Sequence, residues 1–163
     1  MRRSVSATTT PQSLPRRHDD EAATTVDVVV TLDDVAKIAA ELPEVVEGER
    51  DGKRNWSVAG KGFAWERTFS KADIKRFGDD RRPQDPILAV RVEDLGAKEA
   101  VLEANQKGFF TIPHFNGYAA VLIELKIAGK RAVREAFVDG WLACAPDALG
   151  DEFVARTSRG RRN

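Results

Sequence analysis

Apolar and polar residues alternate along the chain in patterns that predict both helices and strands. Residues 32–42 carry apolar side chains at helical spacing on one side. Thr31 and Asp34 precede that run in the arrangement of a capping box, with aspartate in the place of the usual glutamate. Pro43 ends the predicted helix, because the residue before a proline is disfavoured in the α conformation.

Further helices are predicted in the second half of the chain. Asp94 can cap a helix that runs to about residue 102, and residues 131–145 form a longer helix that stops at Pro146. Residues 147–155 would add one or two helical turns. Three apolar side chains would dock these turns: Leu149, Phe153 and Val154.

The strand signals are a hairpin and two separate strands. Residues 55–58 and 63–69 alternate around a turn at Ala59-Gly60-Lys61-Gly62, which predicts the hairpin. Its second arm does not keep one parity, which predicts a bulge or twist near Arg67. Strands are also expected over residues 87–92 and 119–126, the second buried because it is almost continuously apolar.

These elements follow the order α-β-β-β-α-β-α. A hairpin requires antiparallel pairing, so we expect an α+β fold with a single antiparallel sheet and helices packed on one face. The charged residues 70–85 form either a short helix that stops at Gly78 or a long loop.

Composition predicts one folded domain between two tails. Residues 1–24 are rich in Ser, Thr, Arg and Pro, which predicts a disordered tail. Residues 25–156 would form the domain, and residues 157–163 a disordered basic tail. We find neither a secretory signal nor an apolar run long enough for a membrane helix. The single cysteine, Cys144, fits a small buried hydrophobe, so we expect a cytoplasmic protein without membrane partners.

The formal net charge of zero conceals local differences. Residues 50–91 carry eleven basic and six acidic side chains, whereas residues 24–49 carry one basic and seven acidic. The middle segment alone can therefore present a basic surface.

Most tests for catalytic motifs are negative. The glycines beside Lys61 lie inside a hairpin rather than before a helix, so they do not form a phosphate loop. One cysteine and two histidines, of which His18 lies in the N-terminal tail, do not make a zinc site. We therefore expect no metal, no cofactor and no catalytic residues.

His114 has three interpretations. It can pack at the edge of the sheet, contact a ligand or nucleic acid, or act as a general acid or base. A candidate small-molecule pocket would be formed by Phe110, His114, Tyr118 and Trp141.

Basic and aromatic residues alternate on the hairpin. Such a pattern can neutralise phosphates and stack on bases, and it also occurs in an ordinary half-buried sheet with a charged outer face. The candidate DNA-binding residues are Lys53, Arg54, Trp56, Lys61, Arg67 and Arg91. Trp65 belongs to the same pattern.

Several motifs occur in an order that resembles the MmcQ/YjbR-like family over residues 31–146. They include Leu42-Pro43-Glu44-Val45, the hairpin turn, and residues 109–118 (FFTIPHFNGY) followed by a strand and the helix with Trp141. The resemblance implies a frataxin/CyaY-like fold, and the family is presumed to bind DNA. The polar segment of residues 70–85 departs from its pattern.

We therefore expect a small, non-enzymatic, monomeric binding protein that contacts DNA through the basic hairpin. One alternative is a small-molecule-binding protein or enzyme that uses the pocket around His114. The other is a protein–protein adaptor, which an exposed apolar patch on the sheet would favour.

Overall fold

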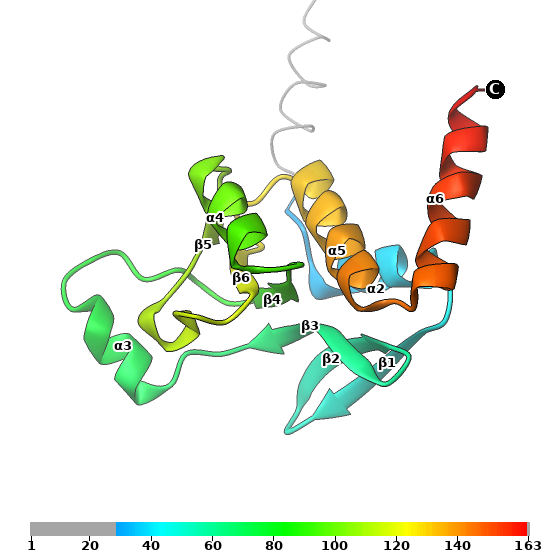
Figure 1. Ribbon diagram of the computed structural model, residues 1–163. Coiled ribbons are helices and arrows are strands. Elements are labelled where there is room, and N and C mark those ends of the chain that lie inside the picture. Colours follow the sequence, from blue (N-terminus) through cyan, green and yellow to red (C-terminus); the bar gives the residue numbers. More distant parts are fainter. Residues whose placement is uncertain (1–28, 163) are drawn as a thin grey trace, which may run out of the picture.

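An antiparallel sheet forms the centre of the computed structural model, which describes residues 29–162 (Figure 1). The strands are β1 (Val45–Arg50), β2 (Lys53–Val58), β3 (Lys61–Arg67), β4 (Ile87–Arg91), β5 (Phe109–Phe110) and β6 (Ala120–Glu124). The helices are α2 (Leu32–Ala40), α3 (Lys71–Phe77), α4 (Leu95–Glu103), α5 (Lys130–Cys144) and α6 (Asp147–Arg162), with a 3-10 turn η1 (Pro113–Phe115). The sheet order is β1-β2-β3-β4-β6-β5, and this arrangement confirms the predicted fold class. The tail predicted over residues 1–24 lies outside the described residues.

The first predicted helix is confirmed, together with its capping box. The Thr31 hydroxyl accepts a hydrogen bond from the Asp34 amide at 3.1 Å, and the Thr31 amide donates to the Asp34 carboxylate at 2.9 Å. Helix starts leave backbone donors without partners, and these two bonds satisfy a pair of them. The helix ends at Ala40, shortly before Pro43.

Two tight turns connect the first three strands, and only the second is predicted from the sequence as a hairpin turn. Asp51 and Gly52 have φ of 53° and 77°, and Ala59 and Gly60 have φ of 52° and 79°. Consecutive positive φ angles define the type I′ turn, whose twist suits a hairpin and which favours Asp-Gly. Strand β1 therefore extends the predicted hairpin to three strands.

The bulge lies at Phe63 rather than near Arg67, so its predicted position is wrong. Trp56 pairs with Ala64, and the register then shifts so that Phe63 is the extra residue of β3. Arg67 pairs regularly with Ile87. The bulge is favoured here because it lets two consecutive side chains, Phe63 and Ala64, enter the same core.

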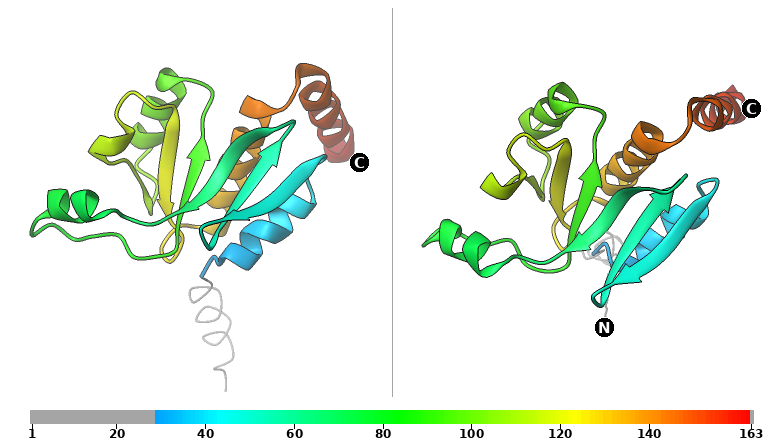
Figure 2. Two further views of the ribbon diagram at one scale, coloured as in Figure 1. Left: turned by 90° about the horizontal axis from the view of Figure 1, so that it is seen from below. Right: turned by 60° about the horizontal axis from the view of Figure 1, so that its bottom comes forward.

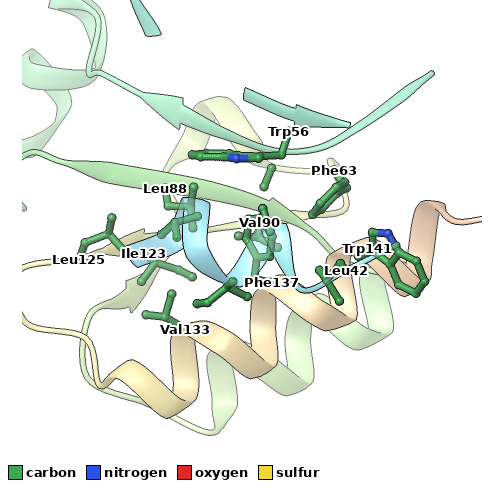
Figure 3. Packing of buried hydrophobic residues seen from close by; sticks show 14 of the residues in the cluster. Leu42, Trp56, Phe63, Leu88, Val90, Ile123, Leu125, Val133, Phe137 and Trp141 are labelled. Atoms are coloured by element: carbon green, nitrogen blue, oxygen red, sulfur yellow. The ribbon is translucent and has the colours of Figure 1, made fainter. Parts of the chain in front are cut away.

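The main core lies between one face of the sheet and helices α2 and α5 (Figure 3). At its centre the ring of Phe137 meets Trp56 at 5.8 Å and Phe63 at 5.0 Å between centroids, both in edge-to-face geometry. Gly140 brings the backbone of α5 close to β4, beside Val90. Helix α4 lies next to α5 on the same side of the sheet (Figures 1 and 2).

Short elements cover part of the other face. Ile87 of β4 and Leu122 of β6 pack there with Phe115 of η1 and Phe77 of α3. The long helices thus share one face, as predicted, while α3 and η1 cover the half of the opposite face formed by β4, β6 and β5.

The charged segment between β3 and β4 forms α3 and then a clamp on the sheet. Ser70 and Asp73 form a second capping box, so the helical alternative is correct for residues 71–77. Arg81 donates to both carboxylate oxygens of Glu124 at 2.9 and 2.7 Å. The backbone amide of Gln84 donates a third hydrogen bond to the Glu124 carboxylate at 3.0 Å, and the three bonds fix the segment to the end of β6.

The end of the chain differs from the prediction. Helix α6 continues to Arg162, so the tail predicted from residue 157 is wrong for the residues that the structure describes. Within this helix the Thr157 hydroxyl donates to the Phe153 carbonyl at 2.9 Å. Phe153 docks the helix on Trp141, whereas Val154 is exposed rather than docked. The rest of α6 projects from the body (Figure 2).

Gly140→Ala should destabilise the protein. A Cβ atom at this position would lie 2.6 Å from Val90 Cγ1 and 3.0 Å from the Arg91 carbonyl oxygen. Because α5 would have to move away from the sheet, we expect the free energy of unfolding to fall by about 1–3 kcal/mol in urea denaturation.

Gly150→Ala is the matched control. Its Cβ would lie 3.5 Å from Leu142 Cδ2, an ordinary contact, inside helix α6. Alanine favours a helix over glycine by up to ~1 kcal/mol, so this variant should be as stable as the parent or more so. Equal losses in both variants would contradict the role assigned to Gly140.

Glu124→Gln should remove part of the stability at neutral pH. The bonds from Arg81 hold the pKa of the buried Glu124 carboxyl below its ordinary value of 4.5, against the opposing effect of burial. As pH falls, the Glu124 carboxyl is therefore protonated at a higher pH in the unfolded chain than in the folded protein. The stabilisation is complete above about pH 4.5 and is lost as pH falls through the folded-state pKa.

Urea denaturation across this range checks the sign. We expect the variant to be less stable by about 1–3 kcal/mol at pH 7, with the difference narrowing below about pH 4.5. Glu152→Gln, at an exposed position of α6, is the control. A constant difference at all pH values would show that the charge of Glu124 is not responsible.

Candidate functional site

One part of the sheet is not covered by any described helix. We call it the open face: the side chains of β1–β3, together with Arg91 of β4, that point away from α2 and α5. Cross-strand partners share a face, and Gly48, Asn55, Trp65 and Ala89 are consecutive partners across the four strands. The small neighbours leave a hollow of about 580 Å³ around the half-buried indole of Trp65.

A second hollow, of about 430 Å³, adjoins the first. It is lined by Trp65, Arg67, His114, Phe115 and Tyr118. Trp65 and Tyr118 line both hollows, and their ring centroids are 6.3 Å apart at an angle of 52°. An aromatic pair therefore stands where the two hollows meet.

Arginine and lysine side chains surround the larger hollow. Arg50, Lys53 and Arg91 line it and form none of the ion pairs found among residues 29–162. The Arg91 guanidinium lies 5.5 Å from the Tyr118 ring centroid, and its Nε atom is buried without a hydrogen-bond partner. Two acidic residues, Asp51 and Glu66, also line the hollow and moderate its positive charge.

The candidate DNA-binding residues do not form one surface. Lys53 and Arg91 lie on the open face. Arg54 also borders the larger hollow, but its guanidinium is held at Asp33 on the helix side, where Trp56 also points. Lys61 is exposed and pairs with Val58 of the main core, so it also lies on the helix side. Side chains of a strand alternate between its faces, and a contiguous run of basic residues is therefore divided between two surfaces.

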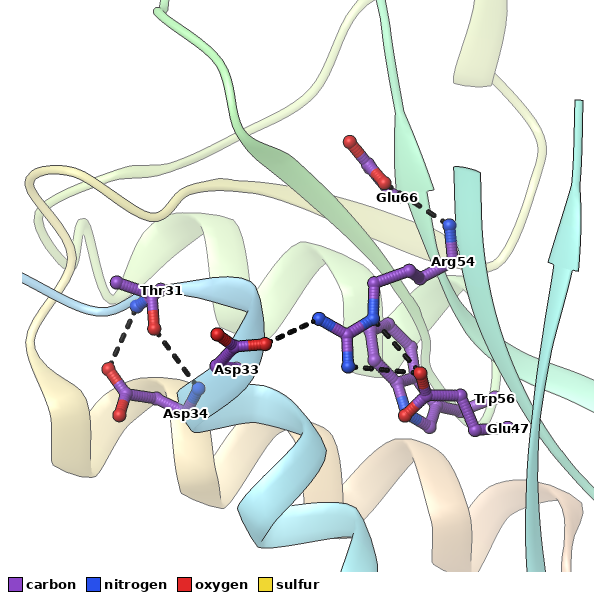
Figure 4. A network of polar contacts seen from close by, with 7 residues as sticks. All are labelled: Thr31, Asp33, Asp34, Glu47, Arg54, Trp56 and Glu66. Atoms are coloured by element: carbon purple, nitrogen blue, oxygen red, sulfur yellow. Dashed lines mark hydrogen bonds and ion pairs between the residues drawn. The ribbon is translucent and has the colours of Figure 1, made fainter. Parts of the chain in front are cut away.

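Arg54 is already neutralised within the protein (Figure 4). It forms ion pairs with Asp33 and Glu47, each at 2.9 Å, and its guanidinium lies 5.7 Å from the Trp56 ring centroid. The hydrogen bond that Arg54 donates to Asp33 raises the pKa of Arg54. Trp56 is fully buried and donates its indole N–H to Glu47 at 3.0 Å, so its prediction as a base-stacking residue is wrong.

Arg67 has partners of its own on the open face. It pairs with the buried Asp73 at 3.1 Å and donates to the Thr68 carbonyl at 2.6 Å. Its guanidinium also lies 5.1 Å from the Phe115 ring centroid. Arg67 therefore supports the wall of the second hollow and is less available to a ligand than Arg91.

The four predicted pocket residues are also divided. His114 and Tyr118 line the second hollow, and Phe110 packs with Phe69 in the adjoining cluster. Trp141 lies in the main core on the opposite side of the sheet, where it is fully buried and donates to the Pro43 carbonyl at 3.1 Å. Its prediction as a pocket residue is wrong, because helix α5 packs on the face of the sheet opposite to the two hollows.

The two hollows present a histidine together with aromatic and basic side chains. His114 is exposed, and within residues 29–162 no side-chain partner orients its ring for proton transfer. In the same part of the chain no three His, Cys, Asp or Glu side chains come together as a metal site. Exposed aromatic rings and unpaired cations can instead contact an anionic, aromatic ligand.

A buried lysine supports the site from the helix side. Lys98 of α4 donates to the carbonyls of Phe115 and Tyr118 at 2.6 and 2.8 Å, and burial lowers the pKa of its ammonium group. It thereby fixes the backbone that presents Tyr118. The sequence contains one sign of this buried role: Lys98 stands at the helical spacing of the apolar residues of α4.

Trp65 and Arg50 are the other residues of the site that the candidate set lacks. Arg50 and Lys53 flank the Asp51-Gly52 turn and are cross-strand partners, so their side chains lie on the same face of the sheet. Recognition of this turn in the sequence would have paired Arg50 with Lys53. Trp65 and Trp56 lie on opposite faces of the sheet only because of the bulge at Phe63, whereas the predicted bulge lies near Arg67.

The fold and the site define an α+β domain that leaves half of one sheet face uncovered. The chain is 37% identical over 132 residues to the uncharacterized protein Rv2570 of Mycobacterium tuberculosis, a match that covers 79% of this chain and 99% of the relative. The uncharacterized protein Mb2600 of Mycobacterium bovis matches to the same extent. The chain belongs to the family of these mycobacterial proteins.

No family model matches the chain. Among solved structures, protein DR2400 of Deinococcus radiodurans, with a DUF419 domain, is similar with a TM-score of 0.47 and 22% identity, covering 69% of this chain and 76% of that one. DUF419 is the MmcQ/YjbR-like family, and membership of this chain in it stays a prediction. Within residues 29–162 no helix has the length and apolar character needed to cross a membrane.

Lys98→Met should loosen the backbone that carries Tyr118. The carbonyls of Phe115 and Tyr118 would lose the two bonds from the charged ammonium group and keep only their backbone donors, the amides of Tyr118 and Ala120, and the loss of such bonds costs about 1–3 kcal/mol. We expect a corresponding loss in urea denaturation and faster hydrogen exchange of the Tyr118 amide. The exposed Lys107→Met is the control. Unchanged exchange at Tyr118 would contradict a positioning role for Lys98.

Proposed function

We propose that this protein binds DNA through the open face of its sheet. The observation that carries the proposal is the hollow around Trp65, where Arg50, Lys53 and Arg91 have no ion-pair partners among the described residues. Cations that form no ion pair, beside accessible aromatic rings, are suited to phosphates and bases together.

The expected affinity is modest. Cations that neutralise phosphates release counterions, and this release supplies most of the non-specific binding energy. Here Asp51 and Glu66 share the hollow with the cations, and Arg54 is neutralised by its own ion pairs. We therefore do not expect a strongly positive field to attract DNA over a long distance. Binding would depend on a few local contacts.

We further infer that the family is MmcQ/YjbR-like. The support is the ordered set of motifs over residues 31–146. The aromatic segment at residues 109–118 is the most specific of them, and it forms β5, η1 and the approach to β6. A DNA-binding role agrees with what is presumed for that family and with a cytoplasmic location.

A small-molecule ligand is the second candidate. The hollow beside His114 has a volume of about 430 Å³, which is in the range of small-molecule sites. The adaptor alternative has less support, because the exposed large apolar residues lie on different elements rather than in one patch. They are Val29, Val46, Ile74, Leu95, Tyr118 and Val154.

Salt dependence of DNA binding tests the proposal. The triple variant Arg50→Ala/Lys53→Ala/Arg91→Ala removes up to three phosphate contacts. Because the slope of log affinity against log salt is about −0.9 per phosphate neutralised, the slope should become less steep by up to roughly 2.7. Fluorescence anisotropy of labelled DNA measures this slope over a roughly tenfold range of salt concentration, from about 20 to about 200 mM.

The control carries the same change in charge on the helix side. Lys37→Ala/Lys61→Ala/Lys130→Ala removes three exposed cations away from the open face, and its slope should match the parent. Loss of binding in both triple variants alike would indicate a non-specific charge effect. No binding at low salt by the parent chain would refute the proposal.

A further inference from the structure

We infer that the open face binds single-stranded rather than duplex nucleic acid, with an unpaired base at Trp65 and a phosphate at Arg91. This inference rests on the proposed function and adds the class of ligand. It starts from the position of the aromatic rings: Trp65 and Tyr118 stand at the junction of two hollows rather than on a projecting element.

A duplex offers these rings no partner. Its bases are stacked inside, so ring faces in a hollow can be reached only by a base that has left the stack. A single strand exposes such faces, and every base has one. The two hollows, of about 580 and 430 Å³, each have room for a nucleotide-sized group and meet at the aromatic pair.

The two rings have different roles. One face of Tyr118 is occupied by the Arg91 guanidinium, at 5.5 Å. The Trp65 indole is therefore the better platform for a base, and Tyr118 serves to hold Arg91 in place. The backbone of Tyr118 is fixed in turn by Lys98, at 2.8 Å from its carbonyl oxygen, so the subsite is largely formed before the ligand arrives.

Arg91 is the phosphate ligand that this arrangement presents. Its Nε atom is buried without a hydrogen-bond partner, and it forms no ion pair within residues 29–162. A planar guanidinium suits the bidentate recognition of phosphate oxygens. A nucleotide with its base on Trp65 would place its phosphate toward the part of the Arg91 guanidinium that lines the larger hollow.

Intrinsic fluorescence can report this subsite selectively. The chain has three tryptophans, and Trp56 and Trp141 are fully buried. Only the indole of Trp65 is then accessible to a stacking base. We would titrate the full chain with a thymine oligonucleotide, a duplex of the same length and thymidine monophosphate, and follow both tryptophan emission and anisotropy.

We expect the single strand to bind at least about tenfold more tightly than the duplex and to quench the emission. Trp65→Leu should weaken single-strand binding by about 5- to 100-fold, the range for loss of one stacked base. Trp65→Phe keeps a ring and should retain most of the affinity. Thermal unfolding of both variants shows whether they remain folded, and Tyr118→Leu provides a second, independent loss of affinity.

The outcomes separate the two proposals. Equal or tighter binding of the duplex, or an unchanged affinity of Trp65→Leu, overturns the single-strand inference while binding through the open face stands. Tighter binding of the monophosphate than of the oligonucleotide also overturns it, in favour of a small ligand. No binding of any of the three probes overturns the proposed function itself.

Discussion

The contact between helix α5 and the centre of the sheet is the interaction on which the rest of the structure depends. Gly140 allows the helix backbone to approach β4, with Val90 and the Arg91 carbonyl where a side chain would otherwise lie. One turn earlier, Phe137 meets both Trp56 and Phe63. The aromatic core closes only because the glycine lets the helix come this close, since protein interiors have little room for adjustment.

That contact also decides which surface remains for function. Helices α2, α4 and α5 lie on one face, and the sheet has six strands to cover. On the opposite face, α3, η1 and the Arg81–Glu124 clamp cover the β4–β6–β5 half. Strands β1–β3 and the near side of β4 keep a face without a helix, and the polar and basic side chains of those strands are compatible with water there.

Charge is distributed between the two sides by the pleat of the strands. Lys53 and Arg54 are neighbours in the sequence, yet Lys53 forms no ion pair on the open face, whereas the Arg54 guanidinium is bound by Asp33 and Glu47 on the helix side. A basic segment in the sequence is therefore a poor measure of a basic surface. Whether a residue lies an odd or an even number of positions from the turn or the bulge matters more, because a shift of one position moves its side chain to the other face of the sheet.

The sequence by itself determined most of the helices, most of the strands and the fold class, because these depend on local spacing, caps and turns. The Thr31–Asp34 capping box, Pro43 and the apolar run of β6 are signals of that kind. Only the tertiary structure decided which residues meet. It placed Trp141 in the core and His114 on the surface, moved the bulge to Phe63, and joined Lys98 to the carbonyl of Tyr118 across twenty residues. These outcomes depend on packing between segments distant in the chain, which no local pattern encodes.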